Sequence, residues 1–598
     1  MKNRNYFLIF IFACCSGVVC TAEGQNKNRH YVKNRIMTTE DGNSFREKVL
    51  YYDNFGKHTE TVQVGASPQG KDLHFTFGYD ILDRPVSESL PLPDGNRNYY
   101  GDAYYYSGCV YGNSSLNRIR ESYGPGAAWR DNGKSVKTEY LVNADSGDLS
   151  CAEFRAEDNG EDVRLIRSGL YAAGELSVAR TTDEDGKVVY TFTDFEGKLL
   201  LTRRMNGTEP HDTYIVYDDR GRKRIVLPPL AADELTATAS WGCNSSEVIK
   251  KYGYVYRYDG RDRVIEKKLP GCDPVHFVYD RSDRLILKQN GNNRKDGVWQ
   301  YYQYDGLGRE VIWGVLPSSA GREDWEVIFR DTVCCERFIG LGQDGNFGYT
   351  NTAAFNESRT PLIVSYYDSY AFEALSDSFL TYVDKPDFGK RIERPSGKLT
   401  GQIIALLNNP ELKEHVTLYY DNRGRVIQTN ACSVSGFHNY SFTKYDFIGQ
   451  PISVRKEHYS IYPAKAILEP EATYDHTIVY DYEYDHAGRL TRLYQTFDKN
   501  ERIKIAEYRY DEAGRLVGKV LHDGKFDCKY DYNIRGWLTE IDEPFMNEKI
   551  YYNEDLPEGV EPLYNGNIAD VYYSAHDSAH FRLSYDGLNR LTASQQYT

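Results

Sequence analysis

The stretch Tyr510-Asp-Glu-Ala-Gly-Arg-Leu-Val-Gly-Lys-Val-Leu521 carries the pattern that decides the fold. Tyrosine and aspartate are followed, after two variable positions, by glycine, arginine and an apolar run, and copies recur between Tyr51 and Thr598. Self-similarity with a period of ~20–50 residues marks a repeat architecture. Five copies supply our candidate site residues: Tyr217, Asp218, Gly221, Arg222, Tyr304, Asp305, Gly308, Arg309, Tyr420, Asp421, Gly424, Arg425, Tyr484, Asp485, Gly488, Arg489, Tyr510, Asp511, Gly514 and Arg515.

Each copy is predicted to form two strands joined by a turn. Tyrosines alternate before the aspartate, as at Tyr254, Tyr256 and Tyr258, and a side-chain period of two is typical of a β-strand. The aspartate carboxylate can accept hydrogen bonds from backbone N–H groups two residues on, and glycine can adopt a positive φ. An apolar run such as Leu516–Leu521 then forms the second strand. The unit is therefore a β-hairpin with a loop of about four or five residues.

Successive hairpins are expected to pair edge to edge, because a single hairpin is only marginally stable. The result is an all-β fold with one long sheet, in which cross-strand tyrosine pairs contribute ~0.2–1 kcal/mol each. The motif arginine can pair with the motif aspartate or lie on a neighbouring tyrosine ring. Because the same residues recur in copy after copy, we assign them structural rather than catalytic roles.

The composition favours the same fold class and excludes others. The chain contains 52 tyrosines and 50 glycines among 598 residues, but only 4 methionines. Tyrosine favours half-buried strands and glycine favours turns, whereas disordered chains lack aromatic residues. The formal net charge of −15 argues against nucleic-acid binding, which depends on positive charge.

The N-terminus indicates export. Lys2 and Arg4 precede an apolar run from Tyr6 to Cys20, shorter than the ~20 residues of a membrane span. We predict a signal peptide over residues 1–22. Alternatively, the segment from Ile11 to Cys14 loosely resembles a lipoprotein cleavage box, with a lipid on Cys14 as the only membrane attachment. In either case the mature chain is expected to be secreted or associated with the cell envelope.

The cysteines are too sparse to build the fold. Eight remain after residue 22, without the CxxC spacing of a zinc site. An even number in an oxidising compartment permits disulfides, and Cys243 with Cys272 is a plausible pair. Cys334 and Cys335 are adjacent and would bond more easily to other cysteines than to each other.

The Tyr-Asp-x-x-Gly-Arg units resemble the YD repeats of RHS and teneurin-like proteins. The segment from His30 to Lys57 resembles the N-terminal domain of unknown function that precedes such repeats in secreted bacterial members. Segments 180–204, 397–407 and 530–542 and the Leu269-Pro-Gly271 triplet also resemble that subfamily. We divide the chain accordingly into a signal peptide (1–22), an N-terminal YD-associated domain (28–180), a YD-repeat region (181–350), an interrupting segment (351–416) and a continuing repeat region (417–598).

The resemblance implies a sheet that spirals into a hollow shell, complete or partial. In full-length bacterial members a core at the C-terminal end plugs the shell and cleaves the chain, and a variable toxin is held inside. The Asp-Pro-x-Gly-Leu type of motif of that core is absent here, since the only Asp-Pro is Asp273-Pro274. We therefore expect that any core and toxin belong to a separate chain, were lost or were never present.

Three stretches interrupt the repeat. Residues 85–180 are expected to form longer loops and irregular strands, 229–250 are predicted to contain a short helix, and 355–416 are expected to be mostly loop with a weakly helical part at Phe372–Phe379. Insertions leave a repeat scaffold at defined points and often carry binding functions.

No catalytic or metal-binding set stands out. His576 and His580 lack the glutamate of HExxH, and strand spacing would hold them far apart. The segment from Asp183 to Gly186 has a passing likeness to a calcium loop but lacks the terminal glutamate, so a tight turn is preferred. There is no GxSxG or Walker motif. We expect no cofactor and no enzymatic activity.

Three functions compete. The first is a non-enzymatic scaffold or shell, perhaps within a toxin-delivery or contact-dependent system, whose partner would be a separate core or toxin chain. The second is binding of cell-surface glycan through exposed rings such as Trp299 or Trp313. The third is a glycan-acting hydrolase with paired carboxylates, although no pair is singled out among the 87 acidic residues.

Overall fold

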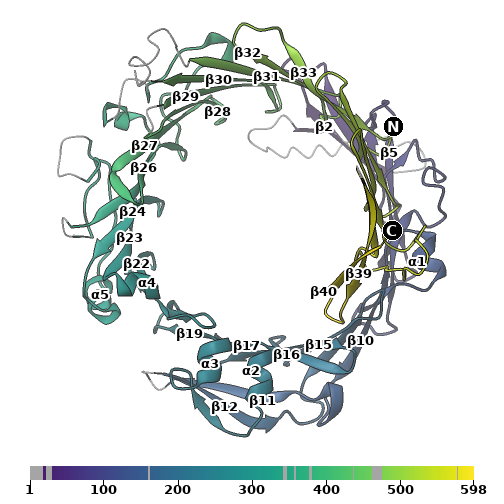
Figure 1. Cartoon of the computed structure of the whole chain (residues 1–598), viewed down its shortest axis with the longest axis vertical. Coiled ribbons are helices and arrows are strands. Elements are labelled where there is room, and N and C mark those ends of the chain that lie inside the picture. The colour runs from purple at the N-terminus through teal and green to yellow at the C-terminus, as the bar shows by residue number, and fades with distance from the viewer. Residues whose placement is uncertain are drawn as a thin grey trace, which may run out of the picture.

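The computed structural model shows one sheet that winds around a central space (Figure 1). It describes residues 18–21, 30–158, 160, 162–340, 346–353, 355, 358–375, 380–434, 437–460, 475–575 and 577–597. Within these residues 37 strands form a single sheet and three form a second one. The all-β hairpin-repeat fold predicted from the sequence is confirmed.

The large sheet, called the wall from here on, is a meander. Strands that follow one another along the chain pair antiparallel, beginning with β2 and β3 and ending with β39 and β40. Its first part contains β1 (Val18–Thr21), β2 (His30–Met37), β3 (Phe45–Tyr52), β4 (His58–Val64), β5 (Leu73–Tyr79), β6 (Pro85–Ser89), β7 (Leu92–Pro93), β8 (Tyr106–Tyr111), β9 (Ile119–Tyr123), β10 (Val136–Val142), β13 (Ser177–Thr182), β14 (Val188–Thr193), β15 (Leu199–Asn206), β16 (Glu209–Tyr217) and β17 (Lys223–Leu227).

The middle of the wall continues without a break in pairing. It contains β19 (Tyr254–Tyr258), β20 (Val264–Lys268), β21 (Val275–Tyr279), β22 (Leu285–Gln289), β23 (Val298–Tyr304), β24 (Glu310–Pro317), β25 (Thr360–Tyr367), β26 (Leu399–Leu406), β27 (Asn409–Tyr420), β28 (Val426–Cys432), β29 (Phe437–Tyr445) and β30 (Pro451–Ser460). Strands β25 and β26 and most of β27 lie within residues 355–416, so the expectation that this segment is mostly loop is wrong.

The last part of the wall passes alongside its earlier part (Figure 1), as shown by contacts of Glu512 with Lys71 and of Gly587 with Asn206. It contains β31 (His476–Tyr484), β32 (Leu490–Phe497), β33 (Ile503–Tyr510), β34 (Leu516–Leu521), β35 (Phe526–Tyr532), β36 (Leu538–Glu543), β37 (Met546–Tyr551), β38 (Asp570–Ser574), β39 (Ser578–Tyr585) and β40 (Leu591–Tyr597).

The second sheet belongs to a cap on the outside of the wall. It contains β11 (Ala152–Asp158), β12 (Val163–Leu170) and β18 (Ser240–Gly242), beside helices α2 (Pro229–Glu234) and α3 (Glu247–Tyr252). The helix predicted within 229–250 is thus present as two short helices. Residues 85–180 contain longer loops, as expected, and supply β6, β8 to β10 and the cap strands; the pairs β8–β9 and β11–β12 each contain a register shift.

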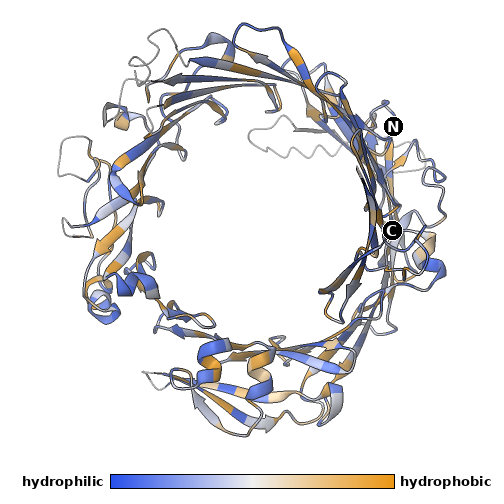
Figure 2. Cartoon of the chain, viewed as in Figure 1, coloured by the Kyte–Doolittle hydropathy of each residue, from blue (hydrophilic) through white to orange (hydrophobic). Residues whose placement is uncertain are grey.

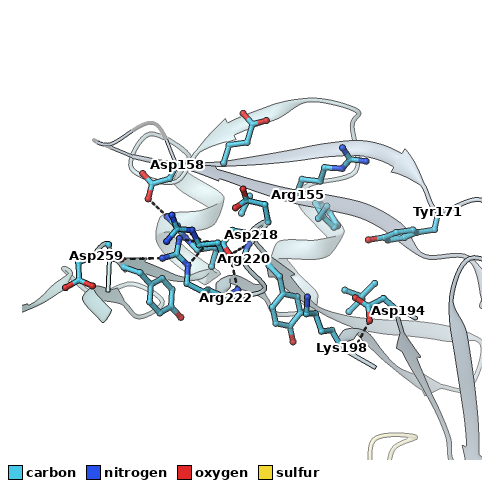
Figure 3. Close-up of a pocket in the computed structure, with 18 residues that line it drawn as sticks. Arg155, Asp158, Tyr171, Asp194, Lys198, Asp218, Arg220, Arg222 and Asp259 are labelled. Atoms are coloured by element: carbon cyan, nitrogen blue, oxygen red, sulfur yellow. Dashed lines mark hydrogen bonds and ion pairs between the residues drawn. The ribbon is translucent and has the colours of Figure 1, made fainter. Parts of the chain in front are cut away.

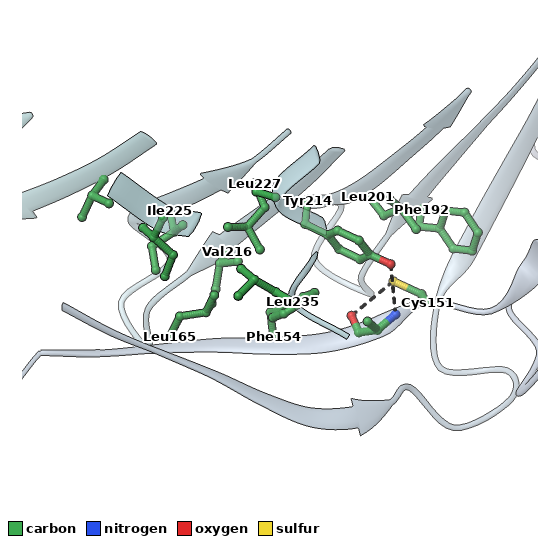
Figure 4. Close-up of a cluster of buried hydrophobic side chains, with 14 of the residues drawn as sticks. Cys151, Phe154, Leu165, Phe192, Leu201, Tyr214, Val216, Ile225, Leu227 and Leu235 are labelled. Carbon is green, nitrogen blue, oxygen red and sulfur yellow. Dashed lines mark hydrogen bonds between the residues drawn. The ribbon is translucent and has the colours of Figure 1, made fainter. Parts of the chain in front are cut away.

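The cap buries an apolar core against the wall. Leu165 of β12 and Leu235, which follows α2, pack with Phe192, Leu201 and Ile225 of the wall (Figure 4). Each of the three wall side chains is fully buried, which stabilises the fold by about 1.5–3 kcal/mol per side chain. The cap is therefore fixed to the wall. Elsewhere apolar residues recur in short stretches along the whole wall (Figure 2).

The other helices are short. They are α1 (Ala127–Asp131), α4 (Gly291–Lys295), α5 (Arg322–Phe329) and the 3₁₀ segments η1 (Gly147–Leu149), η2 (Ala371–Leu375) and η4 (Pro386–Phe388). The weak helix predicted at 372–379 corresponds to η2, and residues 376–379 lie outside the described part. No helix among the described residues has the length and apolarity needed to span a bilayer.

Of the predicted signal peptide, only Val18–Thr21 is described, and it pairs with β2. Cys14 and His576 lie outside the described residues.

Candidate functional site

The motif aspartate organises its own turn. In the copy at Asp305, Oδ1 accepts the backbone N–H groups of Leu307 and Arg309, both at 2.9 Å. Oδ2 accepts Nε of Arg309 at 2.6 Å, and Gly308 adopts a φ of 78°. The turns at Asp218, Asp421 and Asp485 repeat this arrangement. At Asp511 the bonds to Arg515 N and Nε are kept.

The motif tyrosine links one repeat to the repeat before it. The hydroxyl of Tyr510 donates to the carbonyl oxygen of Leu490 at 2.8 Å, and that of Tyr304 donates to Leu285 at 2.9 Å. Tyr420 and Tyr484 make the same contact with Leu399 and Pro451. Each accepting carbonyl except that of Leu399 follows a motif turn directly, beside a bulge that interrupts the strand ladder. The hydroxyl therefore supplies a donor where regular pairing stops.

The motif arginine links its repeat to the next one. Arg425 donates through Nη1 to the carbonyl oxygen of Asp446 at 2.8 Å, and its guanidinium lies 4.9 Å from the ring centroid of Tyr445. Arg222 contacts Asp259 and Tyr258 in the same way. The sequence left open whether the arginine pairs with its aspartate or lies on a ring, and the structure shows both contacts. The motif residues thus connect neighbouring hairpins.

Tyr510→Phe is expected to loosen the link between two repeats without unfolding the wall. The change removes the hydroxyl that donates to Leu490, and losing such a bond costs about 0.5–1.5 kcal/mol. Native-state hydrogen exchange of the β32 and β33 amides measures the loss. Tyr508→Phe is the matched control, because Tyr508 lies on the same strand and its hydroxyl makes no hydrogen bond among the described residues. Equal protection in the two variants would contradict the link.

Acidification is expected to weaken the wall. Burial opposes ionisation of Asp218, but hydrogen bonds from the backbone and side chain of Arg222 outweigh it and lower the pKa of the carboxyl from its ordinary 3.8. The pKa of Asp259 is also lowered. A carboxyl with a lowered pKa adds stability above its unfolded pKa, and this stability is lost as the pH falls through the folded pKa. The urea midpoint should therefore drop below about pH 4, and equal midpoints at pH 7 and pH 3 would contradict this.

A seam joins an early stretch of the wall, residues 46–206, to a late stretch, residues 450–587. Arg489 lies 5.6 Å from the ring centroid of Tyr510 in the next repeat, and its Nη1 donates to the carbonyl oxygen of Ala66 at 2.8 Å. Lys71 Nζ lies 2.7 Å from Glu512 Oε1, and Arg46 Nη2 donates to Gln450 Oε1 at 3.2 Å. The motif turns of the last repeats therefore dock on the first strands.

The centre of the seam is aromatic. Trp129 of α1 is fully buried and donates through Nε1 to the carbonyl oxygen of Tyr564 at 2.8 Å. Its ring meets that of Trp537 edge to face at 5.5 Å between centroids. The guanidinium of Arg535 lies 3.9 Å from the Trp129 ring centroid, and its Nη1 lies 3.2 Å from Glu184 Oε1. These contacts join residues that are several hundred positions apart in the sequence.

Glycine is required beside this cluster. Gly126 adopts a φ of 114°, and a Cβ there would lie 2.6 Å from an atom of the Trp129 ring.

The segment from Asp183 to Gly186, predicted as a tight turn, also takes part in the seam. Gly186 donates to Asp183 in a turn, and the Asp185 carboxylate accepts the backbone N–H groups of Tyr564 and Asn565 at 3.0 and 3.1 Å. This turn therefore stabilises the seam.

Sequence reasoning missed the seam residues. The available signal was the copy that starts at Tyr532, where Gly536 is followed by Trp537 instead of arginine. That departure is explained by the contact between Trp537 and Trp129.

Two sequence-based assignments are wrong. Trp299, offered as an exposed sugar platform, is fully buried and donates to the carbonyl oxygen of Ala320. Cys243 and Cys272, offered as a disulfide pair, are both free, with Cys243 buried and Cys272 exposed. Trp313 is half-buried. Within the described part of the chain, no three His, Cys, Asp or Glu side chains gather in a way that could hold a metal ion.

The wound sheet and the motif contacts between neighbouring repeats place this chain in the class of β-hairpin shells. Residues 25–142 match a family described as "Domain of unknown function (DUF6443)". Salivary gland surface protein 1 of Aedes aegypti is 22% identical over 566 residues, which cover 90% of this chain and 14% of that protein. The solved structure titled "Crystal Structure of TcdB2-TccC3" has a TM-score of 0.58 at 11% identity and covers 98% of this chain and 26% of that one.

The likeness to the TcdB2-TccC3 structure shows that the two chains share a fold. The matched family overlaps the N-terminal region (28–180) that the sequence set apart. The chain spans only 14% of the curated relative and 26% of the solved chain.

Proposed function

We propose that this chain is an exported, non-enzymatic shell scaffold that surrounds a polypeptide supplied with it, as part of a toxin-delivery or contact-dependent system. One observation carries the proposal. The wound sheet comes back alongside its own earlier strands (Figure 1), and the contacts around Trp129 join residues 435 positions apart in the sequence. Such a wall can separate an enclosed chain from the surroundings.

The partner follows from the resemblance. RHS members hold a toxin inside the shell behind a core, and the core motif is absent from this sequence. The chain also covers only 26% of the TcdB2-TccC3 chain. We therefore propose that the enclosed polypeptide is of this core-and-toxin kind.

Protection from protease tests enclosure. An unstructured, lysine-rich polypeptide fused after Thr598 should resist trypsin when the wall is intact. The same fusion carrying Trp129→Ala, which opens the seam, should be cut rapidly. A free copy of the polypeptide mixed with the shell is the control for inhibition of trypsin. Equal cleavage of the fused and free polypeptides would refute enclosure.

Export rests on the leader-like N-terminus. Lys2 and Arg4 precede the apolar run, and the Aedes aegypti relative is named as a surface protein. Fractionation of cells expressing the full chain, with mass spectrometry of the mature N-terminus, tests this proposal. Cleavage after Ala22 supports a free mature chain, and a lipid that disappears in Cys14→Ser supports envelope attachment. An uncleaved chain in the cytoplasm would contradict both.

A further inference from the structure

A pocket of about 470 Å³ lies at the foot of the cap, beside the wall. It is lined by residues that follow β18, by the helix α3 and by the turn between β20 and β21. Gly271 of that turn donates its backbone N–H to the carbonyl oxygen of Lys250 in α3 at 3.0 Å, so the helix and the turn hold each other in place. The turn contains the Leu269-Pro-Gly271 triplet that the sequence set apart. The pocket volume is within the ~300–1,000 Å³ of sites that hold small ligands.

One lysine of this pocket is buried without a counter-charge. Lys268 of β20 lines the pocket and is only 7% exposed. Its ammonium group makes no hydrogen bond or ion pair within the described part of the chain. Burial accordingly lowers the pKa of Lys268 from its ordinary 10.5, because a buried charge that lacks a partner is costly.

The carboxylates that act on Lys268 are engaged elsewhere. Glu247 Oε1 lies 2.9 Å from Lys250 Nζ, and the Glu247 side chain is 86% exposed. The Asp162 carboxylate accepts the backbone N–H of Asn244 at 3.1 Å. The lining itself contains three lysines and two carboxylates. The pocket is therefore positively charged, with its most deeply buried cation unpaired.

Other buried cations in the described part of the chain have a counter-charge. Arg203 and Arg224 are the other buried lysine or arginine side chains there, and each lies within 2.7 Å of an aspartate oxygen. The larger pocket of about 890 Å³ beneath the cap follows the same rule (Figure 3). The cationic side chains that line it each lie within 3.6 Å of a carboxylate, and they are Arg155, Lys198, Arg220, Arg222 and Arg224. Lys268 departs from this rule.

The residue types in the smaller pocket select the ligand. Lysine holds phosphate as a compact point charge, whereas a planar carboxylate is better matched by the fork of arginine. Lys250 and Lys251 of α3 add two further ammonium groups to the lining. An ion with several equivalent oxygens on a tetrahedral centre can contact more than one of these groups at once.

From this arrangement we propose that the pocket binds a tetrahedral oxyanion, either as a free phosphate or sulfate ion or as the phosphate group of a small ester. The anion supplies the counter-charge that Lys268 lacks, and the more exposed Lys250 and Lys251 hold it from the solvent side. The site belongs neither to the seam nor to the links between repeats, so the proposal is independent of enclosure.

Titration calorimetry of the full chain in a phosphate-free buffer tests the site. The probes are inorganic phosphate, sulfate and glycerol 3-phosphate, with acetate as the planar comparison. At least one tetrahedral probe should bind more tightly than acetate. Tighter binding of glycerol 3-phosphate than of phosphate would support an ester as the ligand, and the reverse order would support the free ion.

Lys268→Met keeps the length of the side chain and removes its charge, so it should weaken binding at least tenfold. Lys267→Met is the matched control and should bind normally, because Lys267 is the neighbouring residue on β20 and is not among the residues that line the pocket. Lys251→Gln changes an exposed residue and should weaken binding about threefold. It serves as the second variant if Lys268→Met does not fold.

Three results would overturn the proposal. They are no heat from any tetrahedral probe at millimolar concentration, binding of acetate as tight as that of every tetrahedral probe, and unchanged affinity in folded Lys268→Met or, in its place, Lys251→Gln. The enclosure proposal is judged separately, because Trp129→Ala should leave the affinity for phosphate unchanged and Lys268→Met should leave trypsin protection unchanged.

Discussion

Trp129→Ala is expected to open the seam while the hairpins remain folded. The indole is fully buried, its Nε1 donates to Tyr564, and its ring supports Arg535 and Trp537. Replacing a buried tryptophan by alanine costs about 3–5 kcal/mol. Here the cost falls on contacts between residues 435 positions apart in sequence, so the two ends of the wall separate. Small-angle scattering should show a larger radius of gyration, and amides of Tyr564 and Asn565 should exchange faster.

Trp299→Ala is the control variant that distinguishes opening of the seam from a general loss of stability. Trp299 is as fully buried as Trp129, but it lies in the middle of the wall and packs in a different core. A similar loss of stability is expected, with an unchanged radius of gyration and normal exchange at Tyr564. If both variants expand equally, Trp129 has no special role in closure.

The repeat unit could be predicted because its determinants are local. One turn is closed within five residues, because the Asp305 carboxylate accepts hydrogen bonds from Leu307 and Arg309. Aspartate and glycine impose that geometry wherever they occur at this spacing. The same pattern at each copy then forces successive hairpins into one sheet. Composition and period alone therefore sufficed for the fold class.

The cap and the seam could not be predicted in the same way. The strands β11 and β12 lack an Asp-x-x-Gly turn between them, and β18 joins them only from residue 240 onward. The seam depends on where the wall closes, and closure depends on the summed twist and bulges of many strands. No local pattern encodes that sum. Burial of Trp299 was missed for a related reason, since α5 and the residues around it cover that part of the wall only in the folded chain.

Burial decides how much each motif aspartate contributes to the stability of its hairpin, although the turns share the same hydrogen bonds. Asp280 is fully buried because the residues after α5 fold over its turn, where Cys334 donates its backbone N–H to Oδ2 at 3.2 Å. The same carboxylate accepts two turn amides and the Arg284 guanidinium. In the copy near the C-terminus, Asp586 makes the turn bonds and pairs with Arg590, whose side chain is 64% exposed.

Asp280→Ala is therefore expected to destabilise its hairpin by about 3–5 kcal/mol, because removing one partner leaves Arg284 and several amides without their acceptor in a buried place. Asp586→Ala should cost less, since its partner Arg590 is 64% exposed, although Asp586 itself is only 10% exposed, and water can replace part of the lost contacts. Native-state hydrogen exchange of β21 and β22, compared with that of β39 and β40, measures each effect locally. A wall built of repeats need not unfold in one step, so a single global midpoint would mix the two. Equal losses in the two variants would show that the turn bonds themselves, rather than their burial, set the stability of the repeat.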